Sequence, residues 1–199
     1  MDRRLFARRA PGFTMLEVLI SIFIMTIGLL GLAGLQIQAQ QAELESYQRA
    51  QALILVNDMA DRVNANRRAA GCYNFTTTTA SGAPFAGGGS GNSAPVCGPY
   101  GTIETRARAN ADMTEWHDTL NGAGEQLSGA QVGAMIGARG CVSLDTSVTP
   151  NQYRVSVAWQ SMSKTKAPSA DLTCAKNQYG DEAQRRVVSV TFPMACLNC

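Results

Sequence analysis

A chain of 199 residues is long enough for one domain with a hydrophobic core and too short for two large ones. Its formal net charge is +2, but four arginines lie within the first nine residues: Arg3, Arg4, Arg8 and Arg9. Without the first twelve residues, 13 of the 17 basic and 14 of the 15 acidic side chains remain. A nearly neutral body without clustered cations argues against nucleic acid as the main partner.

The N-terminal part contains one long apolar segment. The 18 residues of Val18–Leu35 carry no charge, and only Ser21 and Thr26 are polar. This length approaches the roughly 20 residues that cross a bilayer core of about 30 Å. The arginines flank the N-terminal side of this segment, so we expect residues 1–12 in the cytoplasm. The apolar segment then crosses the membrane once, and the rest of the chain lies on the other side.

Glu17, just before this segment, argues against two simple interpretations of it: a secretory signal peptide and a plain membrane anchor. A secretory signal peptide has an apolar stretch of about 7–15 residues and gains nothing from a carboxylate there. A plain membrane anchor leaves the same carboxylate without a purpose. A charge at the membrane centre costs roughly 2.5–3.5 kcal/mol, and this cost falls toward the interface. We therefore favour an interpretation in which Glu17 meets a partner.

The run Gly12-Phe13-Thr14-Met15-Leu16-Glu17-Val18 resembles the cleavage site of type IV prepilins. The resemblance implies that prepilin peptidase removes residues 1–12 by cutting after Gly12 and methylates the new N-terminal Phe13. Gly12 suits the cut because it lacks a Cβ. The resemblance also implies that Glu17 neutralises the N-terminus of a neighbouring subunit, where low dielectric strengthens the attraction.

No proline occurs between Pro11 and Pro84, and the apolar segment passes into an amphipathic pattern. Apolar residues recur there at helical offsets: Leu44, Tyr47, Ala50, Ile54, Leu55, Met59 and Val63. We predict one helix from about Thr14 to Ala65, about 80 Å long. Residues 13–36 form its transmembrane or filament-core half, and residues 37–70 its amphipathic half. Two separate helices are the alternative, because Gly28, Gly31 and Gly34 favour a bend; they also suit a close helix–helix contact.

All six cysteines follow this region: Cys72, Cys97, Cys141, Cys174, Cys196 and Cys199. An even number beyond a membrane segment favours disulfides in an oxidising compartment. Six cysteines allow 15 pairings, and the sequence does not choose among them. Chain order suggests Cys72 with Cys97, Cys141 with Cys174, and Cys196 with Cys199. The C-x-x-C of the last pair has neither a following helix for redox chemistry nor a second C-x-x-C for zinc.

The middle of the chain combines a loop and a helix. Residues 76–100 are rich in Thr, Gly, Ser and Pro, and the Gly-Gly-Gly-Ser-Gly run at 87–91 lacks the Gly-Lys-Ser/Thr of a phosphate loop, so we interpret it as a linker. A second helix is predicted from about Ile103 to Leu120, ended by Gly122. The single histidine, His117, lies on it, and we expect it to be solvated rather than a metal ligand.

The C-terminal third predicts strands. In Tyr153–Gln160, large apolar residues alternate with polar or small ones, the period of a half-buried strand. The same alternation occurs in Val188–Phe192, and Cys141–Leu144 is a shorter candidate. An antiparallel sheet covered on one face by the amphipathic half of the long helix gives an α+β, pilin-like fold, with residues 71–199 as a periplasmic globular head.

Within the pilins, several segments look like the PilV group of minor pilins. They are Trp116 after Glu115, Arg139-Gly140-Cys141, Tyr153 to Gln160, and Arg185-Arg186-Val187-Val188. That resemblance implies a low-abundance subunit that primes pilus assembly with other minor pilins. Its partners then include the major pilin and the inner-membrane assembly platform. The location is the bacterial inner membrane and then the extracellular pilus, near the tip.

No catalytic constellation, cofactor motif or metal-ligand spacing supports an enzyme. Asp171, Asp181 and Glu182 match no calcium loop and are expected to be solvated. One rival, a pseudopilin of the type II secretion system, shares the N-terminal features. A rival from another class is a pilus-tip adhesin that binds through residues 76–99.

Overall fold

The structure is a computed structural model that describes residues 12–88, 94–124, 126–128, 130–131 and 135–194. The chain divides into two compact units, Met1–Leu44 and Glu45–Cys199. Most of the expected leader lies outside the described residues, and so does the pair Cys196 and Cys199.

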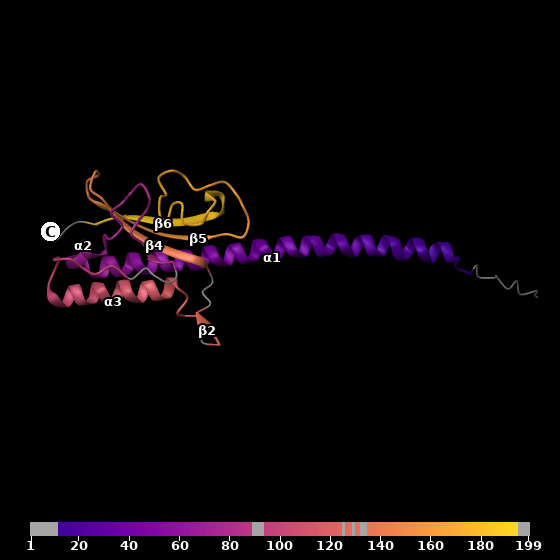
Figure 1. Ribbon diagram of the computed structural model, residues 1–199, viewed down its shortest axis with the longest axis horizontal. Coiled ribbons are helices and arrows are strands. Elements are labelled where there is room, and N and C mark those ends of the chain that lie inside the picture. Colours follow the sequence, from indigo (N-terminus) through magenta and orange to yellow (C-terminus); the bar gives the residue numbers. More distant parts are fainter. Residues whose placement is uncertain (1–11, 89–93, 125, 129, 132–134, 195–199) are drawn as a thin grey trace, which may run out of the picture. The chain divides into compact units, whose positions relative to one another are not determined.

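Helix α1 (Met15–Ala65) is a single helix, as the pattern predicts (Figure 1). It continues through its three glycines because nothing else in the segment breaks a helix. It ends before Asn66, whose backbone (φ −114°, ψ 49°) leaves the helical region. The Asn66 side chain donates to the Thr105 carbonyl at 2.8 Å. Two short helices, η1 (Arg67–Ala69) and α2 (Ala70–Tyr73), follow.

The second unit contains a four-stranded antiparallel sheet in the order β1-β4-β5-β6. Its strands are β1 (Ala86–Gly87), β4 (Ile136–Asp145), β5 (Gln152–Gln160) and β6 (Arg185–Pro193). A separate pair joins β2 (Gln126–Leu127) to β3 (Ala130–Gln131). The expected α+β fold is confirmed, although the first long strand extends well beyond the predicted Cys141–Leu144.

Residues 45–65 of α1 and helix α3 (Ile103–Leu120) cover one face of this sheet (Figure 1). Two fully buried tryptophans fill the interface. The Trp116 indole N–H donates to the Leu55 carbonyl at 2.9 Å, and the Trp159 indole N–H donates to Gln48 at 3.2 Å. Because both indoles find a polar partner, their large apolar surfaces are buried without an unpaired donor.

The prediction that the strand at 153–160 is half-buried is wrong. Ser156 and Ala158 face away from the helices, yet both are buried. The outer face of the sheet carries a second, smaller core of Cys141, Ala158, Cys174, Ala175 and Tyr179. The segment between β5 and β6 supplies the last three of these residues and includes the short helix η2 (Glu182–Gln184).

The interpretation of residues 76–100 as a plain linker is also wrong in part. Ala86 and Gly87 form β1, which pairs with Gly140 and Arg139 of β4. A Cβ on Gly87 would overlap the Ala138 carbonyl oxygen, and its φ of 76° favours glycine as well. Two residues of this region are therefore part of the sheet.

Candidate assembly site on the N-terminal helix

Thr14 begins the site by capping α1. Its hydroxyl accepts the Glu17 N–H at 3.2 Å, and its carbonyl oxygen accepts the N–H groups of Glu17 and Val18 at 3.1 and 3.3 Å. The sequence analysis missed this role, although Thr-x-x-Glu before an apolar run is the signature of such a cap. The cap fixes where the helix starts, and so leaves Gly12 and Phe13 just before its first turn.

Glu17 is the only charged residue from residue 13 to residue 42. Within the described residues its carboxylate has no hydrogen bond and no ion pair. Its place in the first turn favours a negative charge, because the positive end of the helix dipole lies there. Residues 13–42 therefore carry one isolated charge in an apolar surrounding.

The other two polar side chains of the apolar segment are satisfied locally. The Ser21 hydroxyl donates to the Glu17 carbonyl at 2.7 Å, and the Thr26 hydroxyl donates to the Phe23 carbonyl at 2.8 Å. Neither requires a partner from outside the helix. Glu17 is the exception in this segment.

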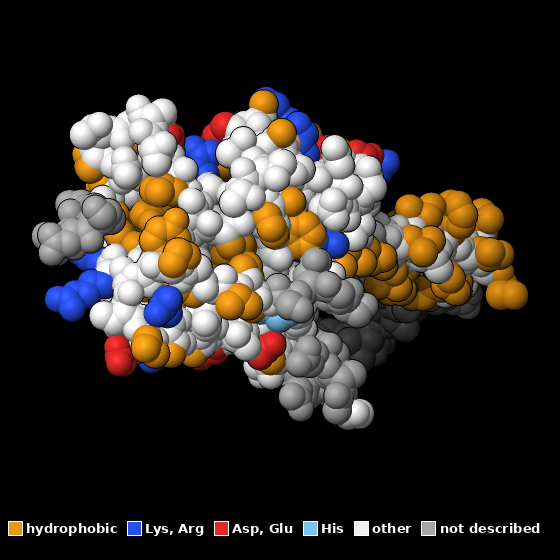
Figure 2. Space-filling model, turned by 60° about the vertical axis from the view of Figure 1, so that its left-hand side comes forward, with side chains coloured by type: hydrophobic (Ala, Val, Ile, Leu, Met, Phe, Trp, Pro, Cys, Tyr) orange, Lys and Arg blue, Asp and Glu red, His pale blue; other side chains and the backbone are white. Residues whose placement is uncertain are grey.

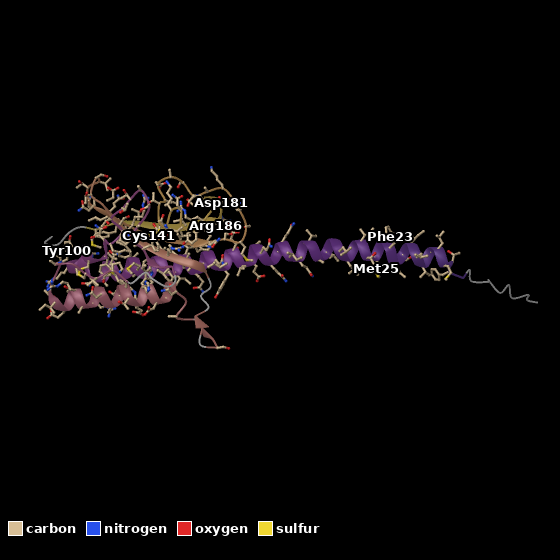
Figure 3. The ribbon with its side chains drawn as sticks, in the orientation of Figure 1. Phe23, Met25, Tyr100, Cys141, Asp181 and Arg186 are labelled. Atoms are coloured by element: carbon tan, nitrogen blue, oxygen red, sulfur yellow. A yellow bond between two sulfur atoms is a disulfide. The ribbon has the colours of Figure 1, made fainter. Side chains whose placement is uncertain are left out.

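The apolar side chains of this unit are uncovered. Phe13 is 85% exposed and Met15 88%. Phe23 and Met25 project from opposite sides of α1 (Figure 3), and hydrophobic side chains cover the visible surface of the segment (Figure 2). The most apolar window of 18 residues has a mean hydropathy of 2.5 and no buried residue. A helix of this length and composition can cross a membrane, and it exposes the surface that lipid or other helices would cover.

Gly28, Gly31 and Gly34 have open space where a Cβ would be. The packing of this chain therefore does not require them.

In the second unit, side chains from α3, β4 and β6 hold its elements together. Gly140 lies against Trp116, where a Cβ would overlap the indole ring. Arg186 of β6 binds Glu45 of α1 at 2.6 Å, 141 residues apart in sequence. Arg185 is buried, pairs with Glu182 at 2.7 Å and donates to the Leu172 and Cys174 carbonyls. These contacts position the elements of the second unit.

Two disulfides join Cys72 to Cys97 and Cys141 to Cys174, the pairs that chain order suggests. The first ties the loop before α3 to α2, and the second ties the segment after β5 to β4. The expected pair of Cys196 and Cys199 lies outside the described residues.

His117 is not simply solvated, which corrects the expectation from sequence. Its Nδ1 accepts the Gly87 N–H at 2.9 Å, and its Nε2 lies 3.0 Å from the Asn121 amide. It joins α3 to β1. Nothing in the sequence pairs a helical histidine with a glycine 30 residues earlier.

Of the three acidic residues expected to be solvated, Asp171 and Asp181 are exposed and Glu182 is partly buried, and all three are also ion-paired. Asp171 meets Arg154 at 3.5 Å, Asp181 meets Lys164 at 2.9 Å, and Glu182 meets Arg185. Burial raises the pKa of Glu182, but hydrogen bonds from Arg185 and the Asn177 N–H outweigh it and leave the pKa below its usual value. Among the described residues, no cluster of three His, Cys, Asp or Glu side chains suits a metal ion.

Comparison with known families gives two matches. Residues 7–33 match the model described as a prokaryotic N-terminal methylation motif, and residues 34–85 match the model described as type IV pilin Tt1218. No curated protein matches the chain. No solved structure matches it either.

Proposed function

We propose that this type IV pilin-like protein with an N-terminal methylation motif is a minor pilin that primes pilus assembly with other minor pilins. The pilin match marks it as a structural protein and not an enzyme. The methylation motif implies processing by prepilin peptidase, followed by passage from the membrane into a pilus. Membership of the PilV group and a place near the tip are parts of the proposal.

The isolated carboxylate of Glu17 carries this proposal. Cutting after Gly12 creates an ammonium group on Phe13, four residues before Glu17 in sequence. Opposite unit charges 4 Å apart attract by about 1 kcal/mol in water and by about 4 kcal/mol at an effective dielectric constant of 20. A neighbour's processed N-terminus therefore offers Glu17 a partner in the apolar surroundings of the membrane, and the pair favours assembly over the separate subunits.

The minor-pilin part of the proposal is supported by the resemblance to the PilV group. The residues that carry it join α1, α3 and the sheet, so the resemblance concerns the fold of the second unit. The tip-adhesin alternative stays open, because residues 77–80 and Val96 of its expected binding loop are exposed.

Replacement of Glu17 tests the central observation. We expect Glu17→Ala to lose its leader normally but to enter sheared pili at least tenfold less than the wild type. Ser21→Ala is the matched control, because Ser21 bonds only to its own helix. Normal amounts of Glu17→Ala in pili would contradict the proposal.

Gene deletion separates a pilus subunit from a secretion pseudopilin. We expect loss of pili and twitching motility with normal protein secretion, and recovery on complementation. Secretion lost with twitching intact would assign the chain to the secretion system.

A further inference from the structure

The outer face of the sheet, which points away from the helices, carries a cavity of about 390 Å³. Its floor comes mainly from β4 and β5, where Ser143 lies opposite Arg154 and Cys141 lies opposite Ser156. One wall is the loop of residues 76–82, and the other is the segment of residues 171–174. The volume falls within the roughly 300–1,000 Å³ that is typical of small-molecule sites.

The walls of this cavity are fixed by covalent and main-chain bonds. The disulfide between Cys141 and Cys174 ties one wall to the floor. The two walls are also joined to each other, because the Ala175 N–H donates to the Gly82 carbonyl oxygen at 3.3 Å. The cavity is therefore preformed, and a ligand loses little free energy in ordering it.

The lining of the cavity is rich in polar side chains without a hydrogen-bond partner in the described part of the chain. They are Thr79, Ser143, Gln152, Ser156, Thr173 and Thr191. Hydroxyl and amide groups can both donate and accept hydrogen bonds. Because these side chains come from three strands and from both walls, they surround one space from several sides.

Ser156 is the most informative member of this group. It is only 4% exposed, yet its hydroxyl bonds to no described residue. Burying a polar group without a partner costs free energy, so such groups are rare in folded proteins. A water molecule takes up about 30 Å³ of liquid, so this cavity has room for a much larger partner.

The charged side chains at the cavity already have partners. Asp145 accepts a hydrogen bond from the Ser147 hydroxyl at 2.6 Å. Arg154 donates to the Asp171 carbonyl oxygen at 2.9 Å and lies 3.5 Å from its carboxylate. The groups left free are therefore neutral. Leu144 and the disulfide are the apolar part of the lining, whereas sites for drug-like molecules are mostly apolar.

We propose that this cavity binds a neutral saccharide. A sugar ring carries several hydroxyls that both donate and accept, so it can satisfy free side chains on several sides at once. Its C–H groups suit the small apolar part of the lining. An anionic sugar is disfavoured, because Arg154, Asp145 and Asp171 together carry a net charge of −1. The site goes beyond the proposed function, since it requires no other subunit.

Sugar binding is measured on the full-length chain in a zwitterionic detergent, because alkyl glycoside detergents carry the proposed ligand chemistry. Glucose, galactose, mannose and N-acetylglucosamine are titrated separately and followed by saturation-transfer NMR, with N-acetylneuraminic acid as the anionic comparison. We expect at least one neutral sugar to bind in the millimolar range and more tightly than the acid. Binding by none of the neutral sugars, or tighter binding of the acid, would overturn the inference.

Ser156→Ala tests whether the sugar lies in this cavity. Because the hydroxyl has no partner within the fold, we expect the variant to keep the wild-type melting temperature. It should bind the sugar about fivefold more weakly, which is the effect of losing one neutral hydrogen bond. Ser189→Ala is the matched control, since Ser189 lies opposite Ser156 on the same face of the sheet but does not line the cavity. Equal binding by the two variants would overturn the inference and leave the assembly proposal, which the Glu17 variant tests, intact.

Discussion

The main chain and the side chain of Glu17 have different roles. Its N–H completes the cap made by Thr14, so the helix begins at a fixed place relative to the Gly12–Phe13 bond. Its carboxylate is left without a partner in the described chain, although Ser21 and Thr26 on the same helix satisfy themselves. One residue thus marks the helix start and supplies the unpaired charge that we propose a neighbouring subunit neutralises.

Tyr179 gives a prediction on alkaline stability. Its hydroxyl lies 2.9 Å from the Gly137 carbonyl oxygen and 3.0 Å from that of Ala158. Burial raises its pKa from 10.0 to about 12, although Arg139 above the ring acts in the opposite direction. The folded chain therefore holds this proton more tightly than the unfolded chain, and the resulting stability is complete below pH 10 and lost between pH 10 and 12.

The measurement is urea unfolding of the wild type and Tyr179→Phe across that pH range. One proton corresponds to a slope of at most about 1.4 kcal/mol per pH unit. We expect the wild type to lose stability more steeply than the variant above pH 10, by up to this amount. Parallel curves would show that Tyr179 does not hold its proton in the fold.

At the scale of elements, the close approach of α3 to β4 depends on Gly140. Because a Cβ there would overlap the fully buried Trp116 ring, the helix must move or the indole must turn. We expect Gly140→Ala to lower the free energy of unfolding by about 1–3 kcal/mol. Gly124→Ala, where a Cβ meets nothing within 4 Å, is the matched control for thermal unfolding. Equal stability of the two variants would contradict this packing.

Several elements follow from sequence because their signals are local. The period of apolar residues in α1 and α3 and the alternation in β5 predict element type and most bounds. The motif that singles out Gly12 and Glu17 is also local, because its residues are contiguous in the sequence. The cap made by Thr14 could have been predicted from the same stretch.

Other elements depend on contacts between distant residues. Strand β1 has two residues and exists only because β4 accepts them. The cover over Ser156 and Ala158 comes from a segment without regular period, so alternation alone predicts an exposed outer face. The links from Arg186 to Glu45 and from His117 to Gly87 join elements far apart in sequence, which no local pattern reveals.

For the whole molecule, the two disulfides lie outside the apolar segment and stabilise the second unit. They close loops with sequence separations of 25 and 33 residues. The chain-entropy model assigns each about 3.5 kcal/mol. We expect Cys141→Ser/Cys174→Ser to lower the melting temperature more than Cys72→Ser/Cys97→Ser. Cys141 and Cys174 are both buried, so the hydroxyl groups of the two new serines lose their solvation. Equal melting temperatures would contradict this ranking.

The two units have separate roles in the proposed function. The first presents an uncovered apolar stretch, residues 13–42, whose one charge is Glu17, and this suits insertion and helix packing. The second has a covered core, held by two disulfides. On this account the first unit brings the chain into the pilus.

The most direct test of the central claim is the mass and N-terminal sequence of the protein recovered from pili. Removal of residues 1–12 from the 199-residue chain leaves 187 residues. We expect the chain to start at Phe13, with one methyl group on its amine and the disulfides intact. An intact N-terminus at Met1, or a start at any residue other than Phe13, would place the terminal amine elsewhere than on Phe13 and contradict the account.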